Sequence, residues 1–378
     1  MGDMPQETKT TGKVVKQRLF GWVDNRLKIN GLVDYMSHKV VPEHRASIWY
    51  YFGGISLFFF VVQVLTGILL LLYYRPGADS AYESVKFIIS EVSFGWLIRA
   101  IHSWSANLMI LAAFVHMFSV FFTHAYRKPR EMTWISGVVL LSLALAFGFS
   151  GYLLPWNELS FFATRVGTGI AGALPVVGGF LMKLMRGGED VTGATIGRFF
   201  GLHVAVLPGI FAVLLSLHLF FIQRQGMSEP IEWEKNPHIP RKFRPFFPNF
   251  IMRELLVWLI MLNILAVLAV FLPDGIGVVH WPLGQKADPF APPPLVIRPE
   301  WYFMFAFQAL KFMPAHFFFM EGELFGIGIL TLGGVIWLAA PFLSRSFEKG
   351  EKPRLLITFG WLVLLFIVVM TVVGYLLK

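Results

Sequence analysis

The chain lacks cysteine altogether and is poor in charged residues. None of its 378 residues is Cys, which excludes disulfides, Cys-ligated zinc, iron–sulfur clusters and thioether-linked haem on this polypeptide. Charged residues make up only 15% of the chain, whereas 56% are hydrophobic, and the mean hydropathy is +0.63. A water-soluble core of this size cannot bury that much apolar surface, including 39 Phe and 12 Trp. We therefore expect an integral membrane protein and exclude a soluble enzyme.

Seven apolar stretches are long enough to cross a bilayer as helices. A membrane β-barrel would need alternating polar and apolar residues, and runs such as ISLFFFVVQVLTGILLLL do not alternate. The predicted fold class is therefore an all-α polytopic membrane protein. Its expected spans are residues 48–74, 101–124, 132–153, 199–222, 251–272, 323–343 and 355–377.

Positive charge is distributed unevenly between the two sides of such a protein. Most of the 32 Lys and Arg fall in the N-terminal tail and in the loops after the second, fourth and sixth spans. The positive-inside rule then places the N-terminus in the cytoplasm and Lys378 outside, as in a bacterial-type inner membrane. This topology explains the net charge of +9 without a nucleic-acid partner.

Two further stretches suggest how the chain is divided. Residues 13–29 place apolar side chains such as Leu19 and Trp22 on one helical face, which predicts a helix lying on the inner membrane surface. The proline-rich and charged stretch 223–250 has the composition of a linker. We expect a cytoplasmic segment at 1–47, a four-helix domain at 48–222, a linker at 223–250 and a three-helix part at 251–378.

Four histidines are expected inside the membrane, where a polar ring needs a partner or a metal. His102 and His116 are fourteen residues apart on the second span, so they project from nearly the same helical face about 21 Å apart. His203 and His218 are fifteen apart on the fourth span and share a broad face. A lone membrane histidine is more often a core residue bonded to a backbone carbonyl. Two register-matched pairs instead favour axial ligation of two stacked haem b groups.

Glycines repeat this spacing on the neighbouring spans. Gly53 and Gly67 on the first span are fourteen residues apart, and so are Gly137 and Gly151 on the third. Missing side chains would let a flat macrocycle pack against the backbone, although glycine is equally common where membrane helices pack closely. Together with the histidines, the glycines favour the haem interpretation.

Two arginines lie where haem propionates would need cationic donors. Arg99 is three residues before His102, on the side where positive charge is otherwise sparse. Arg130 lies in the inner loop RKPRE, where it would serve the second haem. The positive-inside pattern explains Arg130 equally well.

Four segments carry a resemblance to a known family. They read GWLIRAIHSWSANLMILAAFVH, RKPREMTWISGV, GYLLPW and PEWYF, and they resemble cytochrome b of the Rieske–cytochrome b complexes, the quinol:cytochrome c or plastocyanin oxidoreductases. The resemblance covers almost the whole chain. Residues 20–230 are similar to the four-helix cytochrome of the photosynthetic type, and residues 247–378 are similar to its separate three-helix subunit IV.

The resemblance implies how the haem ligands pair. It implies His102 with His203 for the low-potential haem near the outer face, and His116 with His218 for the inner haem. Photosynthetic relatives attach a third haem through a Cys at the position of Tyr51, and this chain cannot form that thioether. The cofactors expected are therefore two non-covalent b haems, with quinol and quinone as substrates.

The resemblance also implies a quinol-oxidising pocket near the outer haem, with Glu300 and Tyr302 as its catalytic residues. Quinol oxidation releases two protons and needs an acceptor within reach, which suits a carboxylate. The alternative for Glu300 is a helix-start carboxylate satisfied by backbone donors. The remaining expected pocket residues are Tyr152, Pro155, Pro299 and Trp301, and an inner quinone site is expected near Asp34, His38 and Arg224.

The sequence thus predicts the cytochrome b subunit of a proton-translocating quinol:cytochrome c oxidoreductase in a respiratory chain. One electron would pass to a Rieske iron–sulfur protein and then to a c-type cytochrome, and the other would cross the membrane to an inner quinone. A homodimer is implied by the resemblance alone. A dihaem anchor subunit of a membrane dehydrogenase would explain the histidines but not PEWYF. A secondary transporter with histidine proton relays would leave the matched glycines unexplained.

Overall fold

The computed structural model describes residues 7–236, 238–344 and 354–377, and Lys378 lies outside this part of the chain. Within it, six helices are long and apolar enough to cross a membrane. They confirm the predicted all-α polytopic fold. These spans are Ser47–Leu71, Gly95–Phe122, Glu131–Leu153, Gly193–Gln225, Phe246–Phe271 and Arg354–Leu376.

The stretch predicted as a span at 323–343 forms a shorter helix than expected. Helix α14 (Gly322–Leu338) has 17 residues, which at 1.5 Å per residue comes to about 26 Å. Pro341 lies in the first turn of the next helix, α15 (Ala340–Leu343), and has no N–H with which to extend α14. The indole N–H of Trp134 donates to the carbonyl of Trp337 over 3.1 Å, so a side chain satisfies part of this helix end.

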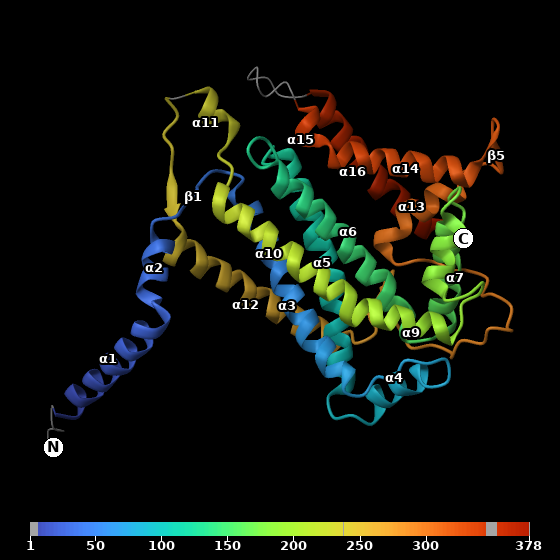
Figure 1. The fold of residues 1–378 in the computed structure, drawn as a ribbon, viewed down its shortest axis with the longest axis horizontal. Helices are drawn as coiled ribbons and strands as arrows, with labels where there is room; N and C mark the ends of the chain where they lie inside the picture. Colours follow the sequence, from blue (N-terminus) through green and yellow to red (C-terminus); the bar gives the residue numbers. More distant parts are fainter. Residues whose placement is uncertain (1–6, 237, 345–353, 378) are drawn as a thin grey trace. The chain divides into compact units, whose positions relative to one another are not determined.

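The first four spans pack as a bundle, in which α3 lies along α5 and α6 lies along α10, while α5 also contacts α6 (Figure 1). The fourth span starts as α9 and continues through the π-helical turn η2, which carries His203. Pro208 follows in the first turn of α10, where its missing N–H permits the wider turn. The bounds are η1 (Ser47–Tyr50), α3 (Tyr51–Leu71), α5 (Gly95–Phe122), α6 (Glu131–Leu153), α9 (Gly193–Gly201), η2 (Leu202–Val206) and α10 (Leu207–Gln225).

Shorter elements and the last spans complete this part of the protein. Helix α13 packs on α14 and α16, and α16 also contacts α5. Two short hairpins, β3–β4 and β5–β6, are antiparallel. The bounds are α4 (Ala81–Ser90), α7 (Glu158–Gly172), α8 (Gly178–Arg186), α12 (Ile251–Phe271), β3 (Gly275–Ile276), β4 (Val279–His280), α13 (Trp301–Lys311), β5 (His316–Phe317), β6 (Met320–Glu321) and α16 (Arg354–Leu376).

An aromatic core joins the four-helix part to the C-terminal helices. Phe121 of α5 is fully buried and stacks on Trp337 of α14 at a ring-centroid distance of 4.2 Å. Trp134 of α6 and Leu356 of α16 belong to the same buried cluster. Stacked rings of this size bury a large apolar area and prefer such offset contacts. The C-terminal helices α14 and α16 are thereby packed against the bundle that carries the four histidines.

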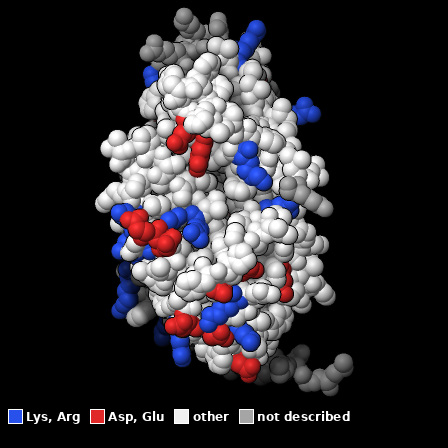
Figure 2. Space-filling model, turned by 90° about the vertical axis from the view of Figure 1, so that its right-hand side faces the viewer, with Lys and Arg blue, Asp and Glu red and all other residues white. Residues whose placement is uncertain are grey.

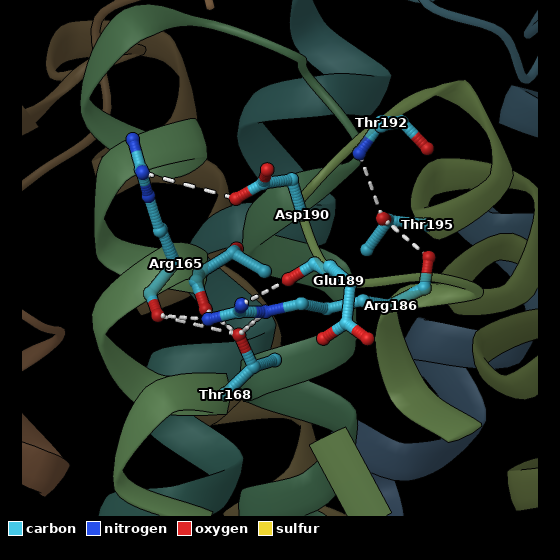
Figure 3. Close-up of polar contacts among 8 residues, drawn as sticks. Arg165, Thr168, Arg186, Glu189, Asp190, Thr192 and Thr195 are labelled. Atoms are coloured by element: carbon cyan, nitrogen blue, oxygen red, sulfur yellow. Dashed lines mark hydrogen bonds and ion pairs between the residues drawn. The ribbon is translucent and has the colours of Figure 1, made fainter. Parts of the chain in front are cut away.

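A buried arginine holds together the segment between α6 and α9 (Figure 3). Only 7% of Arg186 is exposed, and its Nε donates to Thr168 Oγ1 over 2.7 Å. Its Nη1 donates to the Glu189 carbonyl over 2.6 Å and its Nη2 to the Arg165 carbonyl over 2.9 Å. Because the guanidinium bonds to both helix α7 and the turn before α9, it fixes the position of the two flanking helices.

The chain divides into two compact units. One comprises the chain up to Ser47 together with Met227–Val257, and there β1 and β2 pair antiparallel while Arg244 forms an ion pair with Glu43. The other comprises Ile48–Gly226 and Trp258–Lys378. The elements of the first unit are α1 (Glu7–Leu27), α2 (Ile29–Ser37), β1 (Val40–Pro42), α11 (Ile231–Lys235), β2 (Phe243–Pro245) and η3 (Phe246–Phe250), with the first turns of α12.

Two surface features bear on the membrane. Helix α1 covers most of the predicted interfacial stretch at 13–29, and it exposes 63% of Leu19 and 56% of Trp22. Its position on a membrane surface stays a prediction. Figure 2 shows a face on which most atoms belong to uncharged residues while charged side chains gather in a few clusters.

Candidate functional site

Each glycine that the sequence singles out lies against one of the four histidines. Between α3 and α5, a Cβ at Gly53 would lie 3.0 Å from Cε1 of His116, and one at Gly67 would lie 3.5 Å from Cε1 of His102. The spacing of the glycines therefore matches the spacing of the histidines across the helix pair. The missing side chains leave room for the imidazole rings.

The same arrangement recurs between α6 and the fourth span. A Cβ at Gly137 would lie 3.2 Å from Cε1 of His218, and one at Gly151 would lie 2.7 Å from Cε1 of His203. The atoms nearest to all four missing side chains belong to imidazoles. Contact between these glycines and a macrocycle stays a prediction.

The histidines lie near one another in the two pairs that the resemblance implies. The rings of His102 and His203 have centroids 6.4 Å apart, with an interplanar angle of 68°. His116 lies near enough to His218 for the two side chains to interact electrostatically. Imidazole nitrogens bond first-row metals at about 2 Å, so two rings on opposite sides of one metal have centroids roughly 6 Å apart. The first pair therefore has the separation that an axially ligated iron needs.

The donor set also fits a macrocycle better than a bare ion. Among the described residues there is no group of three or more His, Asp or Glu that could hold a metal ion. Two imidazoles are sufficient where a porphyrin supplies the remaining ligands of an iron. The residues present thus fit haem b.

The two arginines expected at the propionates have protein partners. Arg99 Nη1 lies 3.3 Å from Asp274 Oδ1, and its Nη2 donates to the Trp281 carbonyl over 2.6 Å. Arg130 donates through Nε to the Gly226 carbonyl over 3.1 Å and so helps to cap the end of α10. Contact of either residue with a propionate stays a prediction.

A cavity of about 500 Å³ lies beside the third span and collects half of the expected pocket residues. Tyr152, Pro299 and Glu300 line it. Trp301 does not, because it turns away and donates through Nε1 to Asn107 Oδ1 over 2.8 Å. The walls are predominantly apolar, which is typical of a site for a hydrophobic ring compound.

Pro155 and Tyr302 also lie outside the lining of this cavity. Tyr302 is only 5% exposed, and its hydroxyl lies so close to Gly148 that a Cβ there would collide with it. Burial raises the pKa of Tyr302, and the neighbouring carboxylate of Glu300 raises it further. Tyr302 therefore stays a neutral phenol at physiological pH.

Glu300 stands at the N-cap position of α13, yet its side chain makes no capping hydrogen bond to the helix. The backbone-satisfied carboxylate considered as an alternative is therefore not what the structure contains. Burial raises the pKa of Glu300 to about 7. A half-buried carboxyl group that titrates near neutral pH can both accept and release a proton.

The residues expected at the inner quinone site fall in different units. In the first unit, His38 Nδ1 lies 2.7 Å from the carbonyl oxygen of Asp34. Arg224 belongs to the second unit, where its guanidinium lies over the ring of Phe220 at 5.9 Å. This site stays a prediction.

Sequence reasoning missed three hydroxyl residues that contact the histidines. Thr66, Ser136 and Ser150 each lie within hydrogen-bond distance of one imidazole Nδ1. All three immediately precede one of the four glycines, so the signal was present in the sequence as the dipeptides TG, SG and SG.

Fold and site together define a helical membrane protein built around paired histidines, of the kind that carries out electron transfer. Two family profiles identify it further: "Cytochrome b/b6/petB" matches residues 36–226, and "Cytochrome b(C-terminal)/b6/petD" matches residues 286–378. The chain belongs to the cytochrome b family. Membership implies haem b, electron transport and a membrane location.

Individual relatives agree with this assignment. The cytochrome bc complex cytochrome b subunit of Chlorobaculum thiosulfatiphilum is 49% identical over 352 residues, which cover 93% of this chain and 79% of the relative. Cytochrome b6 of Synechococcus sp. (strain JA-3-3Ab) is 44% identical over 214 residues, 57% of this chain and 99% of the relative. A solved chain described as hyperthermophilic respiratory Complex III is similar with a TM-score of 0.75 and 26% identity, covering 94% of this chain and 99% of that one.

Proposed function

We propose that this cytochrome b is the quinol-oxidising subunit of a quinol:cytochrome c oxidoreductase. The observation that carries the proposal is the register between the two glycine pairs and the two histidine pairs within one bundle. His102 with His203, and His116 with His218, would hold two b haems through their imidazoles. These haems would supply one-electron transfer across the membrane, while the second electron leaves through a Rieske iron–sulfur protein to a c-type cytochrome.

The chain's own residues would bind the quinol and take its proton. The cavity beside Tyr152 and Pro299 would accept the quinol ring, since its walls are predominantly apolar. Glu300 would accept a proton from the quinol hydroxyl, because this residue lines the cavity and its pKa is raised to about 7. Burial raises the pKa of Tyr302, so its phenol would stay protonated and be available as a hydrogen-bond donor near the carboxylate of Glu300.

The same proposal includes the partner proteins of the subunit, its membrane and its orientation. The relative described as part of a cytochrome bc complex supports Rieske and c-type cytochrome partners. The charge pattern supports a bacterial-type inner membrane with the N-terminus in the cytoplasm and the quinol pocket on the outer side. A homodimer, and an inner quinone site near Asp34, His38 and Arg224, complete the proposal.

The alternatives are not favoured. The family match includes the C-terminal part with PEWYF, which an anchor subunit of a dehydrogenase would not need. A transporter that relays protons through histidines would not require a glycine against each of the four paired histidines.

The test is a redox titration of the purified complex followed by optical spectroscopy. We expect two b-type components with different midpoint potentials, together with quinol:cytochrome c reductase activity. A single component would overturn the two-haem ligation. Two components without quinol oxidation in the intact complex would support the dehydrogenase anchor instead.

A further inference from the structure

Three of the four paired histidines have a hydroxyl group against Nδ1. The distance from Thr66 Oγ1 to His102 Nδ1 is 2.8 Å, and the distances from Ser150 Oγ to His203 Nδ1 and from Ser136 Oγ to His218 Nδ1 are both 3.0 Å. In each case the hydroxyl residue directly precedes the glycine that makes room for the same imidazole.

The direction of these hydrogen bonds follows from the backbone. Each hydroxyl also lies near a carbonyl of its own helix: Thr66 Oγ1 is 2.7 Å from the Val62 oxygen, Ser136 Oγ is 3.0 Å from the Thr133 oxygen and Ser150 Oγ is 3.2 Å from the Phe147 oxygen. A carbonyl can only accept, so the single hydroxyl proton is donated to it. The hydroxyl oxygen is then available to accept from the imidazole. The rings of His203 and His218 also form hydrogen bonds with the backbone at Phe147 and Thr133, whose carbonyls can only accept, so both contacts favour a proton on Nδ1.

A neutral imidazole with its proton on Nδ1 has its lone pair on Nε2. The hydroxyls therefore fix both the orientation of each ring and the nitrogen that faces a metal. They act through the histidines, without needing to contact the iron themselves.

His116 is the exception. Its Nδ1 is buried, and among the described residues it has no hydrogen-bond partner. The residue before the facing glycine, Gly53, is Phe52, which carries no hydroxyl and instead stacks on Trp49 at 5.5 Å. The pair His116 and His218 thus has one Nδ1 bond, whereas the pair His102 and His203 has two.

We propose that Thr66, Ser136 and Ser150 are positioning residues that set the tautomer and donor strength of the axial histidines. Because Phe52 supplies no hydroxyl to His116, the inner pair has one Nδ1 hydrogen bond fewer than the outer pair. This inference rests on the proposed haem ligation. Donation from Nδ1–H to an oxygen makes the imidazole a stronger donor, which favours the oxidised iron. The missing bond at His116 therefore raises the potential of the inner haem relative to that of the outer haem.

The decisive experiment adds the missing hydroxyl. In the intact complex, Phe52→Ser places a hydroxyl before Gly53 as in the other three positions, and Phe52→Ala is the matched control because it removes the same ring without adding an oxygen. We expect the midpoint potential of the inner haem to be lower in Phe52→Ser than in Phe52→Ala, with the outer haem unchanged in both. Equal inner potentials in the two variants would overturn the proposal.

A second pair of variants removes existing hydroxyls. Ser136→Ala should raise the inner potential and Ser150→Ala the outer potential, each without moving the other. A shift of both haems by either variant would contradict a role confined to one histidine. Absence of b-type components from the wild-type complex would instead refute the proposed haem ligation, so the two failures are distinguishable.

Discussion

Gly151 is the most crowded of the four glycines against its histidine, because a Cβ at this position would lie 2.7 Å from Cε1 of His203. Gly67 faces the partner histidine of the same pair, yet a Cβ there would lie at an ordinary 3.5 Å from Cε1 of His102. The two positions therefore tolerate a methyl group differently, although both lie at the histidine pair proposed to hold one haem.

Gly151→Ala should displace the His203 imidazole and reduce the content of the outer haem, while Gly67→Ala should retain it. Side-chain contacts near 2.7 Å cannot be kept, and in a packed interior the relief comes from moving the ring. The measurement is the haem b content and the redox titration of each purified variant. Equal loss in the two variants would mean that helix packing, and not the ring contact, determines the effect.

This contrast also shows what could be predicted from the sequence. The sequence predicted that the glycine pairs and the histidine pairs lie at nearly the same separation along their helices, because three pairs are fourteen residues apart, His203 and His218 are fifteen apart, and the rise per residue is the same on neighbouring helices. The shortened α14 was missed because the apolar run continues past Pro341. The turning of Trp301 toward Asn107 could not be predicted, because it depends on a partner nearly two hundred residues away.

His116→Ala should remove the inner haem and leave the outer haem in place. Each iron would depend on its own pair of imidazoles, and the two positions on α5 are about 21 Å apart along the helix. His218→Ala should give the same loss. Optical redox titration of the two variants checks both statements, and loss of the outer component in His218→Ala would reveal crossed pairing.

Arg186→Met should destabilise the segment between α6 and α9. The substitution leaves the buried Thr168 Oγ1 and two partly buried carbonyls without their donor, and the unpaired Thr168 Oγ1 alone should cost about 1–3 kcal/mol. Arg198→Met is the control, because Arg198 makes one exposed hydrogen bond, to the Leu184 carbonyl. Thermal unfolding and limited proteolysis of this segment should distinguish the two variants, and equal stability would show that the Arg186 bonds contribute little.

The ionisation of Glu300 should contribute to the pH dependence of the protein's stability. Its pKa is raised from 4.5 to about 7, so the folded protein binds a proton that the unfolded chain has already released between these values. Stability should therefore fall as the pH rises from about 4.5 to 7 and lose no more from this group above that range. Glu300→Gln carries no charge and should lack this component of the pH profile in thermal unfolding.

The same titration should govern catalysis, because only the ionised carboxylate can accept a proton from quinol. Quinol oxidation should therefore increase as the pH rises through about 7. Glu300→Gln keeps the size and the hydrogen-bonding capacity of the side chain but cannot act as a base, so the rate should fall by up to about 10²-fold and the rise near pH 7 should disappear.

Retention of both haems in Glu300→Gln, measured by redox titration, separates this catalytic effect from a folding defect. A matched substitution is Tyr302→Phe, which removes a neighbouring hydroxyl and leaves the carboxylate able to ionise. We expect it to keep the rise in rate near pH 7, even where the rate itself is lower. If Glu300→Gln preserved both the wild-type rate and the wild-type pH profile, Glu300 would have a structural role, and the proton from quinol would leave through another group in the cavity.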